Sequence, residues 1–232
     1  MKELHELKKI TILSGAGLSQ ESGIKTFRDA NGLWENHPIE EVASPGGYQK
    51  NPELVQNFYN LRRRQLKEVQ ANAAHLAIAD LEKLEQKDVL IITQNVDDLH
   101  ERAGSKNIIH MHGELRKIRN TKTNEIKYWE EDILEKDYLS WRPDIVWFGE
   151  EIKGAQRIYQ HLVDTELFIA IGTSSQVYPA AQFFQIVKEN HGLCVELNLE
   201  PTQMSSYYDL SIQGKASEVV PSFLKKLYAD EL

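Results

Sequence analysis

Six short runs rich in β-branched and other apolar residues limit the folds that this chain can adopt. They lie at residues 10–13, 89–92, 108–111, 145–148, 167–171 and 193–197. Apolar runs of this length are typical of strands buried on both faces of a parallel sheet. Helical patterns separate several of the runs. We therefore expect an α/β fold, with a Rossmann-like, mostly parallel sheet and helices on both faces.

Capping residues and apolar periodicity predict four helices. Asn51 and Pro52 are suited to the N-cap and the first position of one of them. Asn72 is suited to cap a second helix that extends to Glu85. Its apolar stripe consists of Ala73, Leu76, Ala77, Leu81 and Leu84. Residues 180–188 and 222–228 show similar patterns.

A smaller module is expected beside the main sheet. No strand-like run follows residue 13 until residue 89, whereas a plain nucleotide-binding unit supplies its second strand within about 30 residues. We therefore predict one catalytic domain over residues 1–232. Its core comprises about 8–24, 72–112 and 143–232, and the inserted module comprises about 25–71 and 113–142.

Composition excludes several classes of protein. The 27 Lys and Arg residues against 35 Asp and Glu give a formal charge of −8, which disfavours a general nucleic-acid-binding surface. Cys194 is the only cysteine, so neither an intrachain disulfide nor a Cys-rich zinc site can form. The apolar runs are far shorter than the roughly 20 residues of a membrane helix. The mixed charges of Met1 to Lys9 do not resemble a secretion signal, so a cytoplasmic location is expected.

Polar clusters follow several of the predicted strands. Gly15-Ala16-Gly17 could let backbone amides approach a pyrophosphate, but Gln20 stands where a dinucleotide fingerprint has its third glycine, and a plain tight turn is an equal alternative. The clusters after later runs are Gln94-Asn95-Val96-Asp97, Gly172-Thr173-Ser174-Ser175 and Asn198-Leu199-Glu200. Ligands collect at the carboxyl ends of parallel strands, so together these clusters predict one binding crevice.

Two histidines end another predicted strand. Alternation along that strand would place His110 and His112 on one face. They could bind a metal together with His100, or one of them could be a general base. A hydrogen-bonded histidine without a catalytic role is the more common case.

The motifs in order resemble the signature series of the sirtuins, which are NAD-dependent protein lysine deacylases. The similarity is carried by residues 15–28, Gly32-Leu33-Trp34, Gln94-Asn95-Val96-Asp97, His112-Gly113 and Gly172-Thr173-Ser174, and it extends from about residue 8 to the end. The resemblance implies that NAD is the co-substrate. It also implies that the acyl-lysine amide oxygen attacks the ribose carbon as nicotinamide leaves. The acyl group then passes to ADP-ribose.

The resemblance also implies roles for particular residues. His112 matches the general base, and Asn95 is the second residue assigned to catalysis. The residues implied to bind NAD are Gly15, Ala16, Gly17, Ser19, Thr26, Phe27, Arg28, Trp34, Gln94, Asn95, Asp97, Gly172, Thr173, Ser174, Asn198, Leu199, Glu200 and Ala216. Acylated lysine peptides are the implied partners, and Val146, Phe148 and Gly149 are expected to contact the extended peptide.

A Tyr-x-x-Arg pair bears on the acyl group. Tyr59 and Arg62 are three residues apart on a predicted helix and share a face. A phenol beside a guanidinium suits a carboxylate. The pair resembles that of the class III sirtuins, which remove succinyl and malonyl groups. Ala43 stands where those proteins have a small residue that widens the acyl pocket. The residues alone favour a solvated basic helix face by about two to one.

One family feature is missing. Sirtuins usually hold a structural zinc with two cysteine pairs after the catalytic histidine, but residues 113–141 contain no cysteine, so no zinc is expected. Apolar contacts are expected to hold the small module instead. The candidates are Ile118, Ile126, Tyr128, Trp129, Ile133, Leu134, Tyr138, Leu139 and Trp141.

Two alternative functions belong to other classes. The chain could be an NAD sensor that binds without turnover, which the missing zinc would suit. The three adjacent arginines at 62–64 could instead contact phosphates in a nucleic-acid-binding module, although the acidic composition disfavours this.

Overall fold

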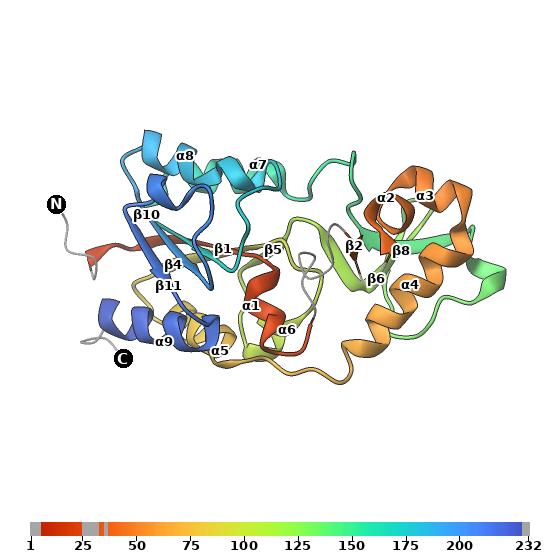
Figure 1. Ribbon diagram of the computed structural model, residues 1–232, viewed down its shortest axis with the longest axis horizontal. Helices are drawn as coiled ribbons and strands as arrows, with labels where there is room; N and C mark the ends of the chain where they lie inside the picture. Colours follow the sequence, from red (N-terminus) through yellow and green to blue (C-terminus); the bar gives the residue numbers. More distant parts are fainter. Residues whose placement is uncertain (1–5, 25–32, 35–36, 229–232) are drawn as a thin grey trace.

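The computed structural model describes residues 6–24, 33–34 and 37–228. In this part of the chain six parallel strands form one sheet, in the order β11-β10-β9-β1-β4-β5 (Figure 1). The strands are β1 (Lys9–Ser14), β4 (Asp88–Thr93), β5 (Ile108–His110), β9 (Leu167–Ile171), β10 (Leu193–Asn198) and β11 (Leu210–Gln213). The expected Rossmann-like α/β fold is confirmed.

Helices cover both faces of this sheet, as the apolar runs predicted. One face packs against α1 (Ala16–Gln20), α5 (Ala73–Glu82) and α9 (Ala216–Leu227). The other face packs against α7 (Ala155–Val163) and α8 (Phe183–Glu189) (Figure 1). Within β1, Ile10 and Ile12 face the first cluster and Leu13 faces the second, so the strand is buried on both sides. In the described part of the chain, no helix has the length and apolar character needed to cross a membrane.

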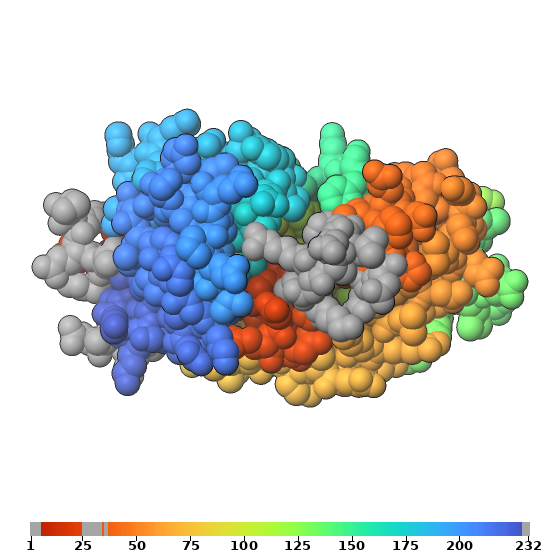
Figure 2. All heavy atoms as spheres, viewed as in Figure 1, coloured from red at the N-terminus to blue at the C-terminus, as the bar shows by residue number. Residues whose placement is uncertain are grey.

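A second group of elements lies at the other end of the molecule. Figures 1 and 2 show α2, α3 and α4 in orange there, opposite the blue C-terminal segment. The helices are α2 (Ile39–Val42), α3 (Pro45–Lys50) and α4 (Pro52–Gln65), and a small hairpin joins β2 (Leu33–Trp34) to β3 (His37–Pro38). The strands β6 (Gly113–Asn120), β7 (Ile126–Tyr128) and β8 (Trp141–Ile145) form an antiparallel sheet in the order β7-β6-β8. Short helical segments complete the described chain at α6 (Leu99–Ala103), Glu135–Asp137, Ala180–Gln182 and Ser205–Tyr207.

Two predicted helix starts are confirmed. The Asn51 side chain accepts a hydrogen bond from the Leu54 amide at 3.0 Å, and Pro52 is the first residue of α4. The Asn72 side chain accepts one from the Ala74 amide at 3.0 Å. The second helix ends at Glu82 rather than Glu85. The predicted helix over 222–228 is part of α9, which begins six residues earlier and continues through Pro221.

The prediction of a strand over 145–148 is wrong. The strand is β8, which ends at Ile145 and pairs with β6 in the antiparallel sheet. The apolar residues that follow serve other purposes, since Trp147 is buried in the small module and Phe148 is exposed. The polar strand β11 was not predicted, because an edge strand that alternates exposed and half-buried residues lacks an apolar run.

The small module is held differently from expectation. Ile118 and Ile133 are buried, whereas Ile126, Tyr128, Leu134 and Leu139 are exposed, so most of the predicted apolar candidates do not form the core. The core instead combines buried residues of α2 and α4 with Leu115, Ile145 and Trp147.

Helix α4 also holds the module through polar contacts. Three of its side chains donate to backbone carbonyls of the segment that follows His112. Gln56 Nε2 lies 3.1 Å from Tyr138 O, Asn60 Nδ2 lies 3.0 Å from Ile133 O, and Arg63 Nε lies 3.0 Å from Leu115 O.

Candidate active site at the sheet edge

The glycine turn lies where the order of the strands in the sheet reverses. Strand β1 pairs with β4 on one side and β9 on the other, and Ser14 is level with both Thr93 and Ile171. The two chain connections that leave β1 and β9 therefore meet at one edge, as expected for a ligand site in an open α/β sheet.

Glycine is required where these connections cross. Gly17 N donates to Gly172 O at 2.9 Å. A Cβ atom on Gly15 would lie 2.6 Å from Gly172 O, and one on Gly172 would lie 2.4 Å from Leu18 N. Gly172 also has φ +60°, in the left-handed region. A side chain at Gly15 or Gly172 would therefore collide with the backbone of the opposite turn.

Direct hydrogen bonds join the polar clusters that the sequence singled out. Gln94 Nε2 donates to Thr173 Oγ1 at 2.9 Å, and Asn198 Nδ2 donates to Thr173 O at 2.7 Å. Asn95 Nδ2 donates to Gly15 O and to Ser19 Oγ, both at 3.1 Å. The structure therefore brings four segments from distant parts of the chain into one site.

Other predicted residues lie around this centre. Ser174 is half-buried beside Thr173, Leu199 and Glu200 are exposed beyond β10, and Ala216 begins α9. Trp34 packs edge-on against Phe58 and Tyr59, with ring centroids 5.0 and 6.0 Å away, so it lies beside α4. Ala16 begins α1. Thr26, Phe27 and Arg28 lie outside the described residues.

His112 has the geometry of a neutral base. Its Nδ1 lies 3.1 Å from Gln94 O, and a carbonyl can only accept, so Nδ1 carries the proton and Nε2 keeps a lone pair. Burial lowers the pKa of His112, and the hydrogen bond to Gln94 only partly opposes this. The imidazole is therefore neutral at neutral pH, with its one proton on Nδ1.

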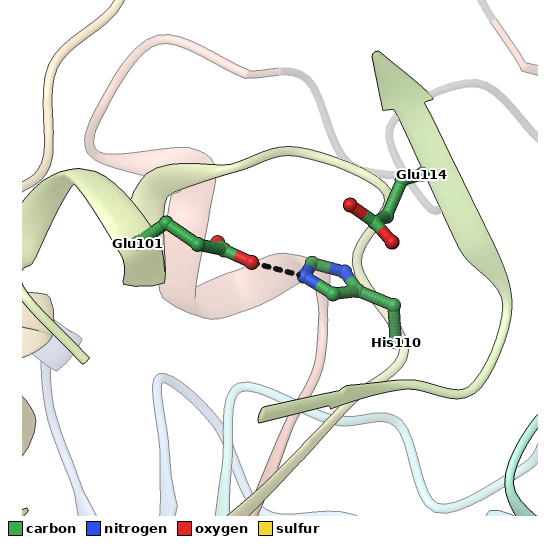
Figure 3. A group of neighbouring side chains, drawn as sticks. All are labelled: Glu101, His110 and Glu114. Carbon is green, nitrogen blue, oxygen red and sulfur yellow. Dashed lines mark hydrogen bonds and ion pairs between the residues drawn. The ribbon is translucent and has the colours of Figure 1, made fainter. Parts of the chain in front are cut away.

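His110 lies in a contrasting environment. Its Nδ1 is 3.3 Å from Asn95 O. Its Nε2 is 2.6 Å from Glu101 Oε1, the contact that Figure 3 marks with a dashed line. Burial alone would lower the pKa of His110, but the carboxylates of Glu101 and Glu114 outweigh it, and the pKa is raised. His100 instead bonds Ser14 Oγ at 2.9 Å, so the three histidines do not converge.

Polar side chains are buried behind the site, and one of them, His75, was not predicted. Asp97 is buried and accepts from Leu99 N at 3.1 Å; burial raises its pKa. His75 lies 3.5 Å from Ser19 Oγ, and burial lowers the pKa of His75 to about 4. The only sequence signal was the position of His75 in the first turn of a capped helix, where its Nδ1 accepts from Asn72 N.

The predicted acyl-binding residues meet in the small module. The buried Tyr59 hydroxyl accepts a hydrogen bond from Trp147 Nε1 at 3.0 Å, and burial raises the pKa of Tyr59. Arg62, one turn further along α4, stacks 4.2 Å from the centre of the Phe58 ring. The charge on Arg62 acts on the Tyr59 phenol, so the two side chains lie within electrostatic range of each other.

The segment after β8 connects the part of the site around Tyr59 to His112. Val146 N donates to His112 O at 2.8 Å, and Phe148 N donates to Ala43 O at 3.0 Å. Trp147, between them, contacts Tyr59. Gly149 follows with φ +90°. One short segment thus forms hydrogen bonds with His112, Ala43 and Tyr59.

Comparisons with known proteins agree with this arrangement. A model described as the Sir2 family matches residues 15–179. A Pasteurella multocida (strain Pm70) protein named NAD-dependent protein deacylase is 52% identical, over 93% of this chain and 96% of its own length. A protein of the same name from Escherichia coli (strain K12) is 49% identical, over 97% of this chain and 84% of its own.

Solved structures show the same fold. A complex of a Sir2 homologue with NAD superposes with a TM-score of 0.91 at 39% identity, covering 100% of this chain and 93% of that one. A Sir2 protein bound to acetylated peptide gives a TM-score of 0.83 at 26% identity, covering 96% and 94%.

Proposed function

The chain belongs to the Sir2 family of NAD-dependent protein deacylases, and we propose that it removes acetyl, succinyl and malonyl groups from protein lysines. His112 is the proposed base, and Tyr59 with Arg62 is the proposed site for an acidic acyl chain. The observation that carries the proposal is the segment Val146–Gly149, which links these two ends of the site through hydrogen bonds.

The residues at the sheet edge fit NAD. Gly15, Gly17 and Gly172 carry no side chain and let the backbones of the two turns pack closely, and such a side-chain-free turn suits close approach of backbone amides to a pyrophosphate. Gln94, Asn95 and Asp97 are proposed to contact the nicotinamide ribose, and Asn198 the adenosine end. When bound, NAD supplies the ribose carbon that accepts the acyl-lysine oxygen as nicotinamide leaves.

His112 is proposed to accept a proton from a ribose hydroxyl at Nε2. Gln94 O fixes the opposite ring nitrogen as the donor, so the lone pair is presented on Nε2. The lowered pKa keeps the imidazole ready to accept at neutral pH. Asn95 holds the glycine turn with its amide and thereby supports the same catalytic step.

Tyr59 is oriented for an acceptor. The indole N–H of Trp147 can only donate, so the Tyr59 oxygen must accept and the phenolic proton points elsewhere. Among the described residues no acceptor is recorded for that proton. The raised pKa keeps Tyr59 protonated, and a carboxylate beside Arg62 would receive the proton in a charge-assisted hydrogen bond.

Peptides are proposed to lie along Val146, Phe148 and Gly149. Phe148 is 53% exposed, and its neighbour Gly149 exposes backbone rather than a side chain. Contacts of this kind read main chain more than sequence, so modest selectivity among acylated lysine proteins is proposed. The single, buried Cys194 suits a reducing compartment, and a cytoplasmic location is proposed.

The arginine cluster does not support a nucleic-acid-binding function. Arg63 is buried and donates to Leu115 O, and Arg64 forms an ion pair with Asp132. Three adjacent arginines in the sequence therefore do not form one phosphate-binding face.

The test is direct. The protein is incubated with NAD and either an acetylated or a succinylated peptide, and nicotinamide and O-acyl-ADP-ribose are measured. The proposal expects both products with both peptides. Binding of NAD without any product would instead identify a sensor.

A further inference from the structure

Two histidines form hydrogen bonds with successive backbone carbonyls of one loop. His112 Nδ1 lies 3.1 Å from Gln94 O, and His110 Nδ1 lies 3.3 Å from Asn95 O. We propose that His110, held as an imidazolium by Glu101, is a positioning residue that fixes the loop 94–97 for cleavage of the nicotinamide bond. The inference rests on the proposed function, because that function places this loop at the nicotinamide ribose.

The hydrogen-bond partners of His110 require two protons on the ring. Asn95 O can only accept, so Nδ1 must donate to it. Glu101 is a carboxylate 2.6 Å from Nε2, so Nε2 donates as well. Figure 3 shows the ring between the carboxylates of Glu101 and Glu114. His112 has the Gln94 carbonyl at Nδ1, and among the described residues no carboxylate is recorded at its Nε2, so His112 is neutral whereas His110 is cationic.

All the charged groups that face His110 act on this balance. Glu101 comes from α6 and Glu114 from β6, and both favour the imidazolium. Glu114 is also paired with Lys117 at 2.5 Å, so its effect on the ring is the weaker one. Positive charge on His110 stabilises the carboxylate of the nearby Asp97. The same charge disfavours a second positive charge on the buried His100.

Both the backbone carbonyl and the side-chain amide of Asn95 hold the loop. His110 fixes its carbonyl, while its side-chain amide bonds Gly15 O and Ser19 Oγ. Loss of the proton from His110 leaves one N–H for two acceptors. The carboxylate bond is the stronger, so Nε2 keeps the proton and Nδ1 turns a lone pair toward Asn95 O. The carbonyl then loses its partner, and the loop moves relative to the glycine turn.

The first experiment isolates the bond-breaking step. Exchange of labelled nicotinamide into NAD, with acyl peptide present, reports cleavage before His112 is needed as a base. His110→Gln places its amide near the former Nε2 and loses the hydrogen bond to Asn95 O. The exchange rate should therefore fall roughly tenfold, with a larger change in kcat than in the KM for NAD. His110→Asn places its amide near Nδ1 and should stay closer to wild type.

The second experiment uses pH. The wild-type exchange rate should decline at alkaline pH as His110 loses its proton. Glu101→Gln should move that decline to lower pH by about one unit, since an adjacent opposite charge shifts a pKa by about this much or more. Glu114→Gln is the matched control, because it removes one charge from the same cluster without a recorded bond to the ring. It should move the decline by less.

The outcomes separate cleanly. Folded variants, verified by unchanged melting temperature, that exchange at the wild-type rate with an unmoved alkaline decline would overturn the inference. Equal losses in His110→Gln and His110→Asn would overturn it too, since the bond to Asn95 O would then be irrelevant. A wild-type protein that exchanges no nicotinamide would instead reject the proposed function.

Discussion

Replacing Tyr59 by phenylalanine removes one oxygen from the proposed acyl site. The phenol is buried, and among the described residues it accepts one recorded hydrogen bond, from Trp147 Nε1 at 3.0 Å. In the proposed function its proton is donated to a succinyl carboxylate, which an acetyl group lacks. A hydrogen bond to a charged group contributes about 1.5–3 kcal/mol, which corresponds to a roughly 10- to 150-fold change in rate.

The Tyr59→Phe variant should thus lose roughly 10- to 150-fold in kcat/KM for a succinylated peptide and little for the acetylated one. It should also lose about 1–3 kcal/mol of stability, since the buried Trp147 N–H loses its acceptor. Steady-state kinetics with matched peptides and denaturant unfolding measure the two effects.

Tyr48→Phe is the control for stability alone. Its hydroxyl donates to Tyr138 O elsewhere in the same module, so this variant should lower stability without changing the preference between acyl groups. Equal losses for both peptides in Tyr59→Phe would refute the assignment of Tyr59 to acyl recognition. An unchanged rate on the succinylated peptide would refute it as well.

Four further outcomes are expected. Because burial lowers the pKa of His112, acyl transfer should stay constant on the acid side of neutrality and fall only below pH 6.5; a fall centred above that value in a kcat/KM profile would contradict this. Arg63→Ala should cost about 3 kcal/mol in denaturant unfolding by leaving buried carbonyls unpaired, while Arg64→Ala, on the exposed neighbour, should barely move the midpoint. Gly172→Ala should weaken NAD binding at least tenfold by calorimetry, because its Cβ would collide with Leu18 N. A chelator should leave activity unchanged, and inhibition reversed by added zinc would contradict the expectation that no structural zinc is bound.

Much of the main sheet could be predicted because burial on both faces leaves apolar runs in the sequence. Strands β1, β4, β9 and β10 each carry such a run. Strand β6 could not be found this way: its sequence GELRKIRN alternates charged and apolar residues, and only one face is buried. The pairing of β8 with β6 depends on contacts between distant segments, which local pattern does not contain.

The helix α5 shows how tertiary contacts override an apolar stripe. Periodicity placed Leu76 in the core, but it is 50% exposed. The buried face instead carries His75, which reaches Ser19 in the layer behind the glycine turn. A polar residue that is satisfied by a partner from another segment cannot be assigned to the interior from its own helix.

The residues of the candidate site that lie in sequence motifs could be predicted. The residues that hold them in place could not. Gln94, Asn95 and Thr173 were singled out as strand-end residues, and hydrogen bonds join their segments. The contribution of Trp147 was missed, because only the fold shows that its indole donates to Tyr59. The role of α4 in holding the small module was also missed, since Gln56, Asn60 and Arg63 look like an ordinary polar helix face.

The central claim is that His112 Nε2 takes the ribose proton and so moves the acyl group to ADP-ribose. The most direct measurement compares wild type with His112→Ala, using NAD, labelled nicotinamide and an acylated peptide, with products analysed by mass spectrometry. Wild type should exchange nicotinamide and form O-acyl-ADP-ribose, whereas His112→Ala should still exchange nicotinamide and form almost no O-acyl-ADP-ribose. Undiminished O-acyl-ADP-ribose from the variant would contradict the account.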